Sequence, residues 1–369
     1  MKKIQVLKPK YRVDECLKEI KECLDIGWTG MGFKTLDFEK AWSNYTGLGF
    51  SHFLNSATVG LHLALKVLKE RHGWDDYDEV ITTPLTFVST NHAIKYVNME
   101  PCFVDIDDSL NLSPEHILNS INKKTRAIIF VGIGGNTKNL LEVIDIAKKH
   151  NLKLILDAAH MAGSYIKKRH VGFDCDVSVF SFQAVKNLPT ADSGMICFNN
   201  EADDQAARRL SWLGISKDTF SRNNKGSYLW DYNVDQVGYK YHGNSIMAAI
   251  GLVSLKYLDE DNAYRRRLAK RYIKNLKDKV NIIEHDSNET SRHLFQITVE
   301  DRELAIQRLY QNEVFPGVHY RQNTEYLPFR TNQKLAKAKH YSDRLLSLPL
   351  HLNLTEDDID FISEIILTS

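Results

Sequence analysis

The fold class follows from the stretch Leu152-Lys153-Leu154-Ile155-Leu156-Asp157-Ala158-Ala159-His160, a short apolar run that ends in polar residues. A second run of this kind follows at Val177-Ser178-Val179-Phe180-Ser181. Further apolar runs occupy 79–83, 102–106 and 127–131, and stretches with helical spacing, such as 61–68 and 140–150, lie between the runs. Short apolar strands that alternate with helices are typical of a mostly parallel sheet covered on both faces. We therefore expect a three-layer α/β fold.

The last third of the chain predicts a second, smaller unit. A charged helical pattern spans about 248–279 and contains the run Arg265-Arg266-Arg267, which we interpret as a solvated helix face. Strand-like and helical patterns follow at 282–300 and 302–312, and an amphipathic pattern ends the chain at 356–367. We predict a large domain over 1–250, which includes an N-terminal arm, and a connector helix with a small α+β C-terminal domain over 251–369.

Composition limits the classes of partner. Lys and Arg total 48 against 47 Asp and Glu, so a formal net charge of +1 favours neither nucleic acid nor an anionic membrane. The 5 cysteines lie far apart without a C-x-x-C pair, which is typical of a reducing compartment and of buried thiols. The sequence has no apolar run of the length of a signal peptide core or a membrane span. We expect a cytoplasmic protein.

Lys186 and Asp157 carry the clearest chemical signal. Ligands of parallel sheets gather beyond the carboxyl ends of the strands, where Asp157 ends one predicted strand and Ser181 ends the next. Ser181 begins the segment Ser181-Phe182-Gln183-Ala184-Val185-Lys186-Asn187, which contains Lys186. A lysine can hold pyridoxal phosphate as a Schiff base, and an aspartate can keep the pyridine nitrogen protonated, which makes the ring an electron sink. The alternatives are an exposed loop lysine and an aspartate that caps a following helix. We favour catalytic roles for both residues, with pyridoxal 5'-phosphate as cofactor and no metal ion.

The chain resembles, over nearly its whole length, the nucleotide-sugar aminotransferases of the DegT or StrS group. These are dimeric pyridoxal phosphate enzymes of the aspartate aminotransferase fold, fold type I. A single motif is a weak signal, whereas seven in the same order are a strong one. The matching segments are Asn55-Ser56-Ala57-Thr58-Val59-Gly60-Leu61, Pro84-Leu85-Thr86-Phe87-Val88-Ser89-Thr90, Phe103-Val104-Asp105-Ile106-Asp107, Asp157-Ala158-Ala159-His160, Ser181-Phe182 to Lys186-Asn187, Gly238-Tyr239-Lys240-Tyr241-His242 with Ala248-Ala249-Ile250-Gly251, and Leu346-Ser347-Leu348-Pro349-Leu350.

The resemblance implies positions around the cofactor ring. Phe87 and Ala159 would lie on its two faces, and His160 would lie near its phenolic oxygen. Phe87 can instead be an ordinary core phenylalanine. His160, at the junction between a strand and a predicted helix, can instead be a core histidine with satisfied hydrogen bonds.

The cofactor phosphate has candidate ligands in two segments. The turn at Ser56, Ala57 and Thr58 offers backbone N–H groups, a hydroxyl and the positive end of a helix, and Ser181 offers a second hydroxyl. An N-cap role for the same turn is compatible with phosphate binding.

Three positions depart from the family pattern. Ala57 stands in place of a glycine, which matters if the turn needs positive φ, and the segment 188–194 retains only Gly194 of a glycine-rich run. Lys240 stands where many members have an asparagine that reaches the phosphate of the neighbouring subunit. It can serve that phosphate as a point charge or simply be exposed.

The implied reaction is transfer of an amino group from L-glutamate to the keto group of a nucleotide-linked deoxysugar. The segment Tyr239-Lys240-Tyr241-His242 weakly favours the branch of the family that acts on 4-keto sugars over the 3-keto branch. The implied assembly is a homodimer with shared active sites. The alternatives are a dehydratase of the same fold, in which the family replaces the lysine by histidine, and a non-catalytic regulator that binds the cofactor. Three segments are candidates for sugar or nucleotide contacts, namely Trp28 to Gly32, Tyr320-Arg321 and Lys217 to Arg222. The glycines of 132–136 indicate room for substrate, a flexible loop, or merely a turn.

Overall fold

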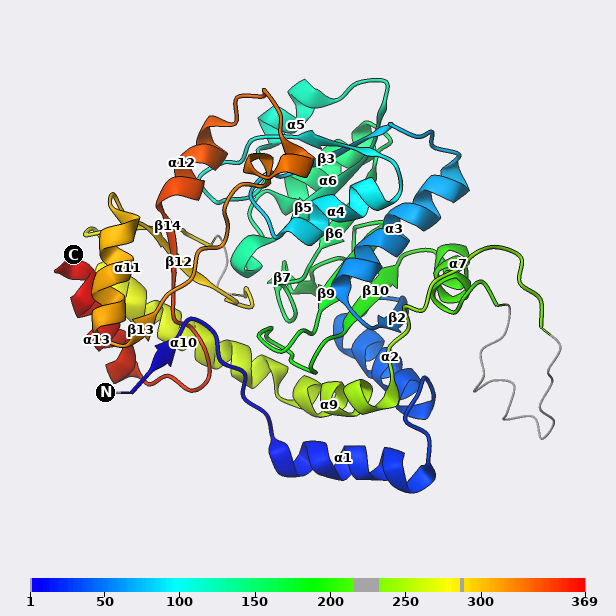
Figure 1. The fold of residues 1–369 in the computed structure, drawn as a ribbon, viewed down its shortest axis with the longest axis horizontal. Coiled ribbons are helices and arrows are strands. Elements are labelled where there is room, and N and C mark those ends of the chain that lie inside the picture. The colour runs from blue at the N-terminus through cyan, green and yellow to red at the C-terminus, as the bar shows by residue number, and fades with distance from the viewer. Residues whose placement is uncertain (1, 216–231, 286–288, 369) are drawn as a thin grey trace.

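The computed structural model describes residues 2–215, 232–285 and 289–368, and its centre is a seven-stranded sheet (Figure 1). β10 runs antiparallel to both of its neighbours, whereas the other adjacent strand pairs are parallel. The expected mostly parallel sheet is confirmed. Across the sheet the strands are β2 (Phe50–Leu54), β10 (Gly194–Phe198), β9 (Val177–Ser181), β6 (Lys153–Asp157), β5 (Thr125–Val131), β3 (Glu79–Thr82) and β4 (Glu100–Phe103).

Helices cover both faces of this sheet. Ile128 and Phe130 of β5 belong to one hydrophobic cluster, and Ile129 and Val131 belong to another, because successive side chains of a strand point to opposite faces. Each fully buried side chain of this size contributes about 1.5–3 kcal/mol, so both faces hold the layers together. The first cluster includes residues of α2 (Phe33–Thr46), α5 (Pro114–Ser120), α6 (Leu140–Lys149) and α9 (Ser245–Lys256); the second includes residues of α3 (Ala57–His72), α4 (Val88–Tyr96) and α7 (Glu201–Ser211).

A second sheet lies toward the C-terminus of the chain. Its antiparallel strands are β11 (Asn281–Ile282), β12 (Phe295–Thr298) and β14 (Leu345–Leu348). The helices of this part are α10 (Leu258–Leu276), α11 (Arg302–Gln311), α12 (Ala336–Arg344) and α13 (Glu356–Leu367). The division at residue 250 stays a prediction.

The N-terminal segment joins the two parts. β1 (Ile4–Gln5) pairs in parallel with β13 (Val314–Phe315), next to the second sheet in Figure 1. Ile4 lies in one hydrophobic cluster with residues of α10, β12 and α13. The following helix, α1 (Val13–Ile26), packs against α9 of the large part. The arm therefore contacts both parts of the molecule. The remaining short elements are β7 (Tyr165–Ile166), β8 (Arg169–His170), η1 (Ile133–Gly135), η2 (Asn323–Glu325) and η3 (Leu327–Phe329).

Three expectations need correction. The helix expected over 248–279 is two helices, because the backbone leaves helical geometry at Tyr257. β4 begins at Glu100, earlier than the expected 102–106. Arg265 is only 7% exposed, so the arginine run is not a uniformly solvated face.

Two expectations from composition can be compared with the structure. All five cysteines are free thiols, four of them buried and Cys102 partly buried, as expected. Among the described residues, no helix is both long and apolar enough to cross a membrane.

Candidate active site

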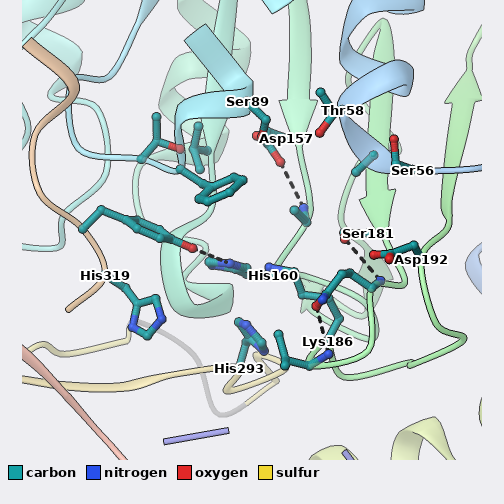
Figure 2. Close-up of a pocket in the computed structure, with 18 of the residues that line it drawn as sticks. Ser56, Thr58, Ser89, Asp157, His160, Ser181, Lys186, Asp192, His293 and His319 are labelled. Carbon is teal, nitrogen blue, oxygen red and sulfur yellow. Dashed lines mark hydrogen bonds between the residues drawn. The ribbon is translucent and has the colours of Figure 1, made fainter. Parts of the chain in front are cut away.

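A cavity of about 480 Å³ lies at the carboxyl ends of the parallel strands. Asp157 ends β6 and Ser181 ends β9, and both line the cavity together with Lys186 (Figure 2). In Figure 2, Ser56, Thr58, Ser181 and Asp192 gather on the right, and His160, His293 and His319 lie toward the left. The structure therefore brings most of the predicted site residues to one place. The predicted residues that line the cavity are Ala57, Thr58, Phe87, Asp157, Ala159, His160, Ser181 and Lys186.

Asp157 is a buried carboxylate held by two hydrogen bonds. Its Oδ2 accepts from the Thr90 hydroxyl at 2.8 Å, and its Oδ1 accepts from the Ala159 N–H at 3.2 Å. Burial raises the pKa of Asp157, although these bonds and the charge of Lys186 oppose the shift. No helix follows β6, since residues 158–164 form turns, and the helix-cap alternative for Asp157 is therefore wrong. A cationic partner at this carboxylate would offset the cost of its burial.

Lys186 follows β9 in a turn that is held by hydrogen bonds to Gln183. Its N–H donates to the Gln183 carbonyl at 2.8 Å, and the Gln183 side chain accepts from the Val185 N–H at 3.0 Å. Burial lowers the pKa of the Lys186 amine to about 8, with the Asp157 carboxylate acting in the opposite direction. At neutral to mildly alkaline pH a sizeable fraction of this amine is uncharged, and an uncharged amine is nucleophilic.

The N-terminus of α3 opens into the cavity. Ser56 caps this helix, because its hydroxyl accepts from the Val59 N–H at 3.4 Å. The first N–H groups of a helix have no partner within the helix, so they are available to an anion. Ala57 is the first helical residue and does not have positive φ, so the departure from glycine imposes no strain there. A Cβ atom on Gly194 would lie 2.7 Å from the Ala57 nitrogen, which explains the need for glycine at this position.

An aromatic wall completes the cavity. Phe87 is 57% exposed, so it is not an ordinary core phenylalanine. Its ring lies 6.0 Å from the ring of Tyr320, measured between centroids. A flat apolar ligand can therefore contact the exposed face of Phe87.

Two histidines present opposite hydrogen-bonding groups. His160 Nδ1 accepts from the Gly134 N–H at 3.1 Å, so its proton is on Nε2, which lies 3.2 Å from the Tyr320 hydroxyl. The Asn187 amide donates to two oxygens, so its carbonyl oxygen accepts from His293 Nδ1 at 2.8 Å, which leaves Nε2 of His293 without a proton. Burial is the main cause that lowers both pKa values well below the usual range, so both rings are neutral. His160 thus offers a donor and His293 an acceptor, with ring centroids 4.3 Å apart.

Sequence comparison identifies the family to which this site belongs. Residues 11–367 match the model of the DegT/DnrJ/EryC1/StrS aminotransferase family. The chain belongs to this family. SpsC, a spore coat polysaccharide biosynthesis protein of Bacillus subtilis (strain 168), is 32% identical over 95% of this chain and 93% of its own length.

Solved structures agree with this assignment. PseC of Helicobacter pylori, an aminotransferase involved in the biosynthesis of pseudoaminic acid, matches with a TM-score of 0.91 and 25% identity over 100% of this chain and 99% of PseC. Spr1654 of Streptococcus pneumoniae in its PLP form matches with a TM-score of 0.89 and 27% identity over 100% of this chain and 98% of Spr1654, and its PMP form matches as well. The DegT/DnrJ/EryC1/StrS member described here is a pyridoxal phosphate-dependent aminotransferase.

The cavity has the groups that this cofactor requires. A buried carboxylate at the end of β6 suits a protonated ring nitrogen, and the N-terminus of α3 with the Thr58 and Ser181 hydroxyls suits a phosphate. Burial raises the pKa of Asp157, and a cationic partner at this carboxylate would oppose that shift. The residues therefore fit the cofactor of the DegT/DnrJ/EryC1/StrS family.

Several cavity residues were not predicted. His293 and His319 come from the C-terminal part of the chain, and no local motif marks them. Tyr320 was a candidate and lines the cavity, whereas its neighbour Arg321 pairs with Glu325 outside it. The only available signal for His319 was its position next to Tyr320.

Other candidates lie elsewhere. Lys240 does not line the cavity of its own chain, and its Nζ lies 3.6 Å from the centre of the Trp212 ring. The glycines of 132–136 form the buried turn η1, and Gly134 supplies the N–H that holds His160. Trp28 to Gly32 are not among the cavity residues, and Lys217 to Arg222 lie outside the described residues.

Proposed function

We propose that this enzyme transfers an amino group from L-glutamate to the keto group of a nucleotide-linked deoxysugar, with a 4-keto-6-deoxy sugar as acceptor. The observation that carries the proposal is the presence of both the Lys186 amine and the Asp157 carboxylate in one cavity at the sheet edge. The names of the relatives support a sugar acceptor, since SpsC is a polysaccharide biosynthesis protein and PseC acts in pseudoaminic acid biosynthesis. We place the reaction in the cytoplasm, as part of the synthesis of glycan precursors.

The proposed roles follow from the groups that each residue presents. Lys186 attaches the cofactor covalently, and the Asp157 carboxylate accepts a hydrogen bond from the protonated ring nitrogen. Phe87 and Ala159 would contact the ring, and His160, whose Nε2 lies 3.2 Å from the Tyr320 hydroxyl, would lie near the phenolic oxygen. The N-terminus of α3 at Ala57 and Thr58 binds the phosphate together with Ser181.

Proton transfer is the proposed chemical task of Lys186. Bound pyridoxal phosphate supplies an electron sink that makes a proton on the substrate carbon removable. After the amine of the substrate has replaced Lys186 in the bond to the cofactor, the freed Lys186 amine, whose pKa is about 8, would accept this proton and return it to a carbon of the cofactor. The fixed Asp157 carboxylate supplies the negative charge that favours a cationic ring nitrogen throughout.

Two other functions are less well supported. A dehydratase of the same fold would have a histidine in place of Lys186, according to the resemblance. A regulator without turnover would not require the low pKa of the Lys186 amine. Transfer of an amino group by the purified protein would exclude the regulator.

The absorbance spectrum of the holoenzyme tests the proposed role of Lys186. We expect a visible band that L-glutamate bleaches in the wild type, and no such band in Lys186→Ala, because the variant lacks the attached amine. Lys270→Ala, which removes an exposed lysine on α10, is the control and should keep the band. A bleachable band in Lys186→Ala would contradict the assignment.

The proposed homodimer shares active sites through Lys240, which would reach the phosphate in the partner subunit. Lys240→Ala and Lys186→Ala are each expected to be weakly active alone. In a mixed dimer, one site regains both intact residues, so mixing and reassociation of the two variants should restore activity to about one quarter of the sites if subunits exchange at random. Activity of the mixture equal to the mean of the parents would rule out sharing through Lys240.

A further inference from the structure

Arg265 is a buried cation whose hydrogen-bonding capacity is not fully used by the described residues. It lies in α10 and is 7% exposed, and its Nη1 has no hydrogen-bond partner among the described residues. Asp261, one turn earlier, attracts it, but both Asp261 oxygens already accept from Arg12 at 2.7 Å. Burial lowers the pKa of Arg265 to about 10, so the guanidinium stays charged at neutral pH. A buried charge of this kind is costly unless something pairs with it.

The guanidinium lines a second cavity, which is also lined by residues of the loop that carries Lys186. This cavity shares Leu7, Val185, Lys186 and His293 with the active-site cavity. Three further cationic side chains line it, Lys8, Lys10 and Arg12, and Asp261 is the only carboxylate among its lining residues. The charge of Arg265 also contributes to the lowered pKa of His293. The electrostatic field in the cavity therefore favours an anion.

The size of the cavity limits the anion. Its volume is about 10 Å³, which is room for roughly one water-sized sphere. Phosphate and sulfate, with five heavy atoms each, and a carboxylate, with three, exceed that room further than an anion of a single atom does. A water molecule would fit, but it would leave the positive charge of Arg265 without compensation.

We propose that this cavity binds one small inorganic monovalent anion of the size of chloride, held by the guanidinium of Arg265. The anion would lie near Val185 and Lys186, which line both this cavity and the active-site cavity. The site does not depend on the identity of the sugar or of the amino donor.

Thermal unfolding of the holoenzyme tests the site. Sodium chloride or bromide replaces sodium gluconate at constant pH and constant ionic strength, and the midpoint is followed against halide concentration. We expect a saturable rise of about 1–3 °C in the wild type, because a ligand that binds the folded state stabilises it. The rise should be absent in Arg265→Gln and retained in Arg267→Gln, whose side chain on the same helix is 61% exposed.

A rise that does not saturate, or that is equal in all three proteins, would overturn the proposal, as would stabilisation by acetate but not by halides. Bromide in crystals of the wild-type holoenzyme gives a second measurement that does not depend on folding of the Arg265 variant. An anomalous peak within hydrogen-bond distance of Arg265 Nη1 supports the site. A water molecule or a side chain of either subunit at that place rules it out.

Discussion

Asp157→Asn should lower kcat/KM for amino transfer by about 10²–10³-fold, with the cofactor still bound. The amide oxygen can still accept from the Ala159 N–H, and the amide N–H can donate to the Thr90 hydroxyl oxygen, so the local geometry should persist. It carries no charge, however, and cannot favour the protonated form of the ring nitrogen. Steady-state kinetics with L-glutamate and a keto sugar measure the loss, and the absorbance spectrum measures cofactor occupancy.

Asp145→Asn is the control for this experiment. Asp145 lies on α6 and is exposed, away from the cavity, and its substitution should leave kcat/KM unchanged. Activity of Asp157→Asn within a few-fold of the wild type would remove the proposed role of the carboxylate. A parallel loss in both variants would point to a general defect instead.

Gly194→Ala should weaken cofactor binding and destabilise the fold. The added Cβ would lie 2.7 Å from the Ala57 nitrogen and 2.8 Å from the Phe180 oxygen, and both are backbone atoms that cannot rotate away. The start of α3 must therefore move relative to β10. Overpacking of this kind costs about 1–3 kcal/mol, which corresponds to roughly a 5- to 150-fold loss of affinity if it falls on the phosphate site.

Titration of the apoenzyme with pyridoxal phosphate and thermal unfolding of the apoenzyme separate the two effects of Gly194→Ala. Gly49→Ala is the matched control, because a Cβ on Gly49 meets no atom within 4 Å and its φ is not positive. We expect the control to bind the cofactor as the wild type does. Unchanged affinity in Gly194→Ala would show that the phosphate site tolerates a shift of α3.

Local pattern was sufficient for the sheet and for the two central residues of the site. The apolar runs before Asp157 and Ser181 are β6 and β9. A residue at the end of a predicted strand can be recognised from the sequence alone, and ligands of parallel sheets bind at such strand ends. A helix cap in the turn of Ser56 to Thr58 was one of the two compatible interpretations of that turn, and Ser56 is the cap, which is a contact between near neighbours in the sequence.

Contacts between segments that are far apart in the sequence could not be predicted from local pattern. His293 and His319 enter the cavity from segments that no pattern links to β6. The break at Tyr257 carries neither glycine nor proline, so nothing local marks it. Arg265 is different: the buried residues of α10 recur at helical spacing, and Arg265 falls on that stripe between Leu258 and Tyr272. We predicted that Arg265 is solvated because it is charged, although its position on this stripe indicates that it is buried.

The pairing of β1 with β13 also sets an order of events during synthesis. Ile4 pairs with Val314, so Ile4 waits for a partner that is synthesised about 310 residues later. At 5–20 residues per second, this delay is roughly 15–60 s. During that time the apolar face of the arm has no strand beside it, and the second sheet cannot close around Ile4. The arm therefore reaches its final position only after residue 314 has left the ribosome. During this delay a chaperone has time to bind the nascent arm.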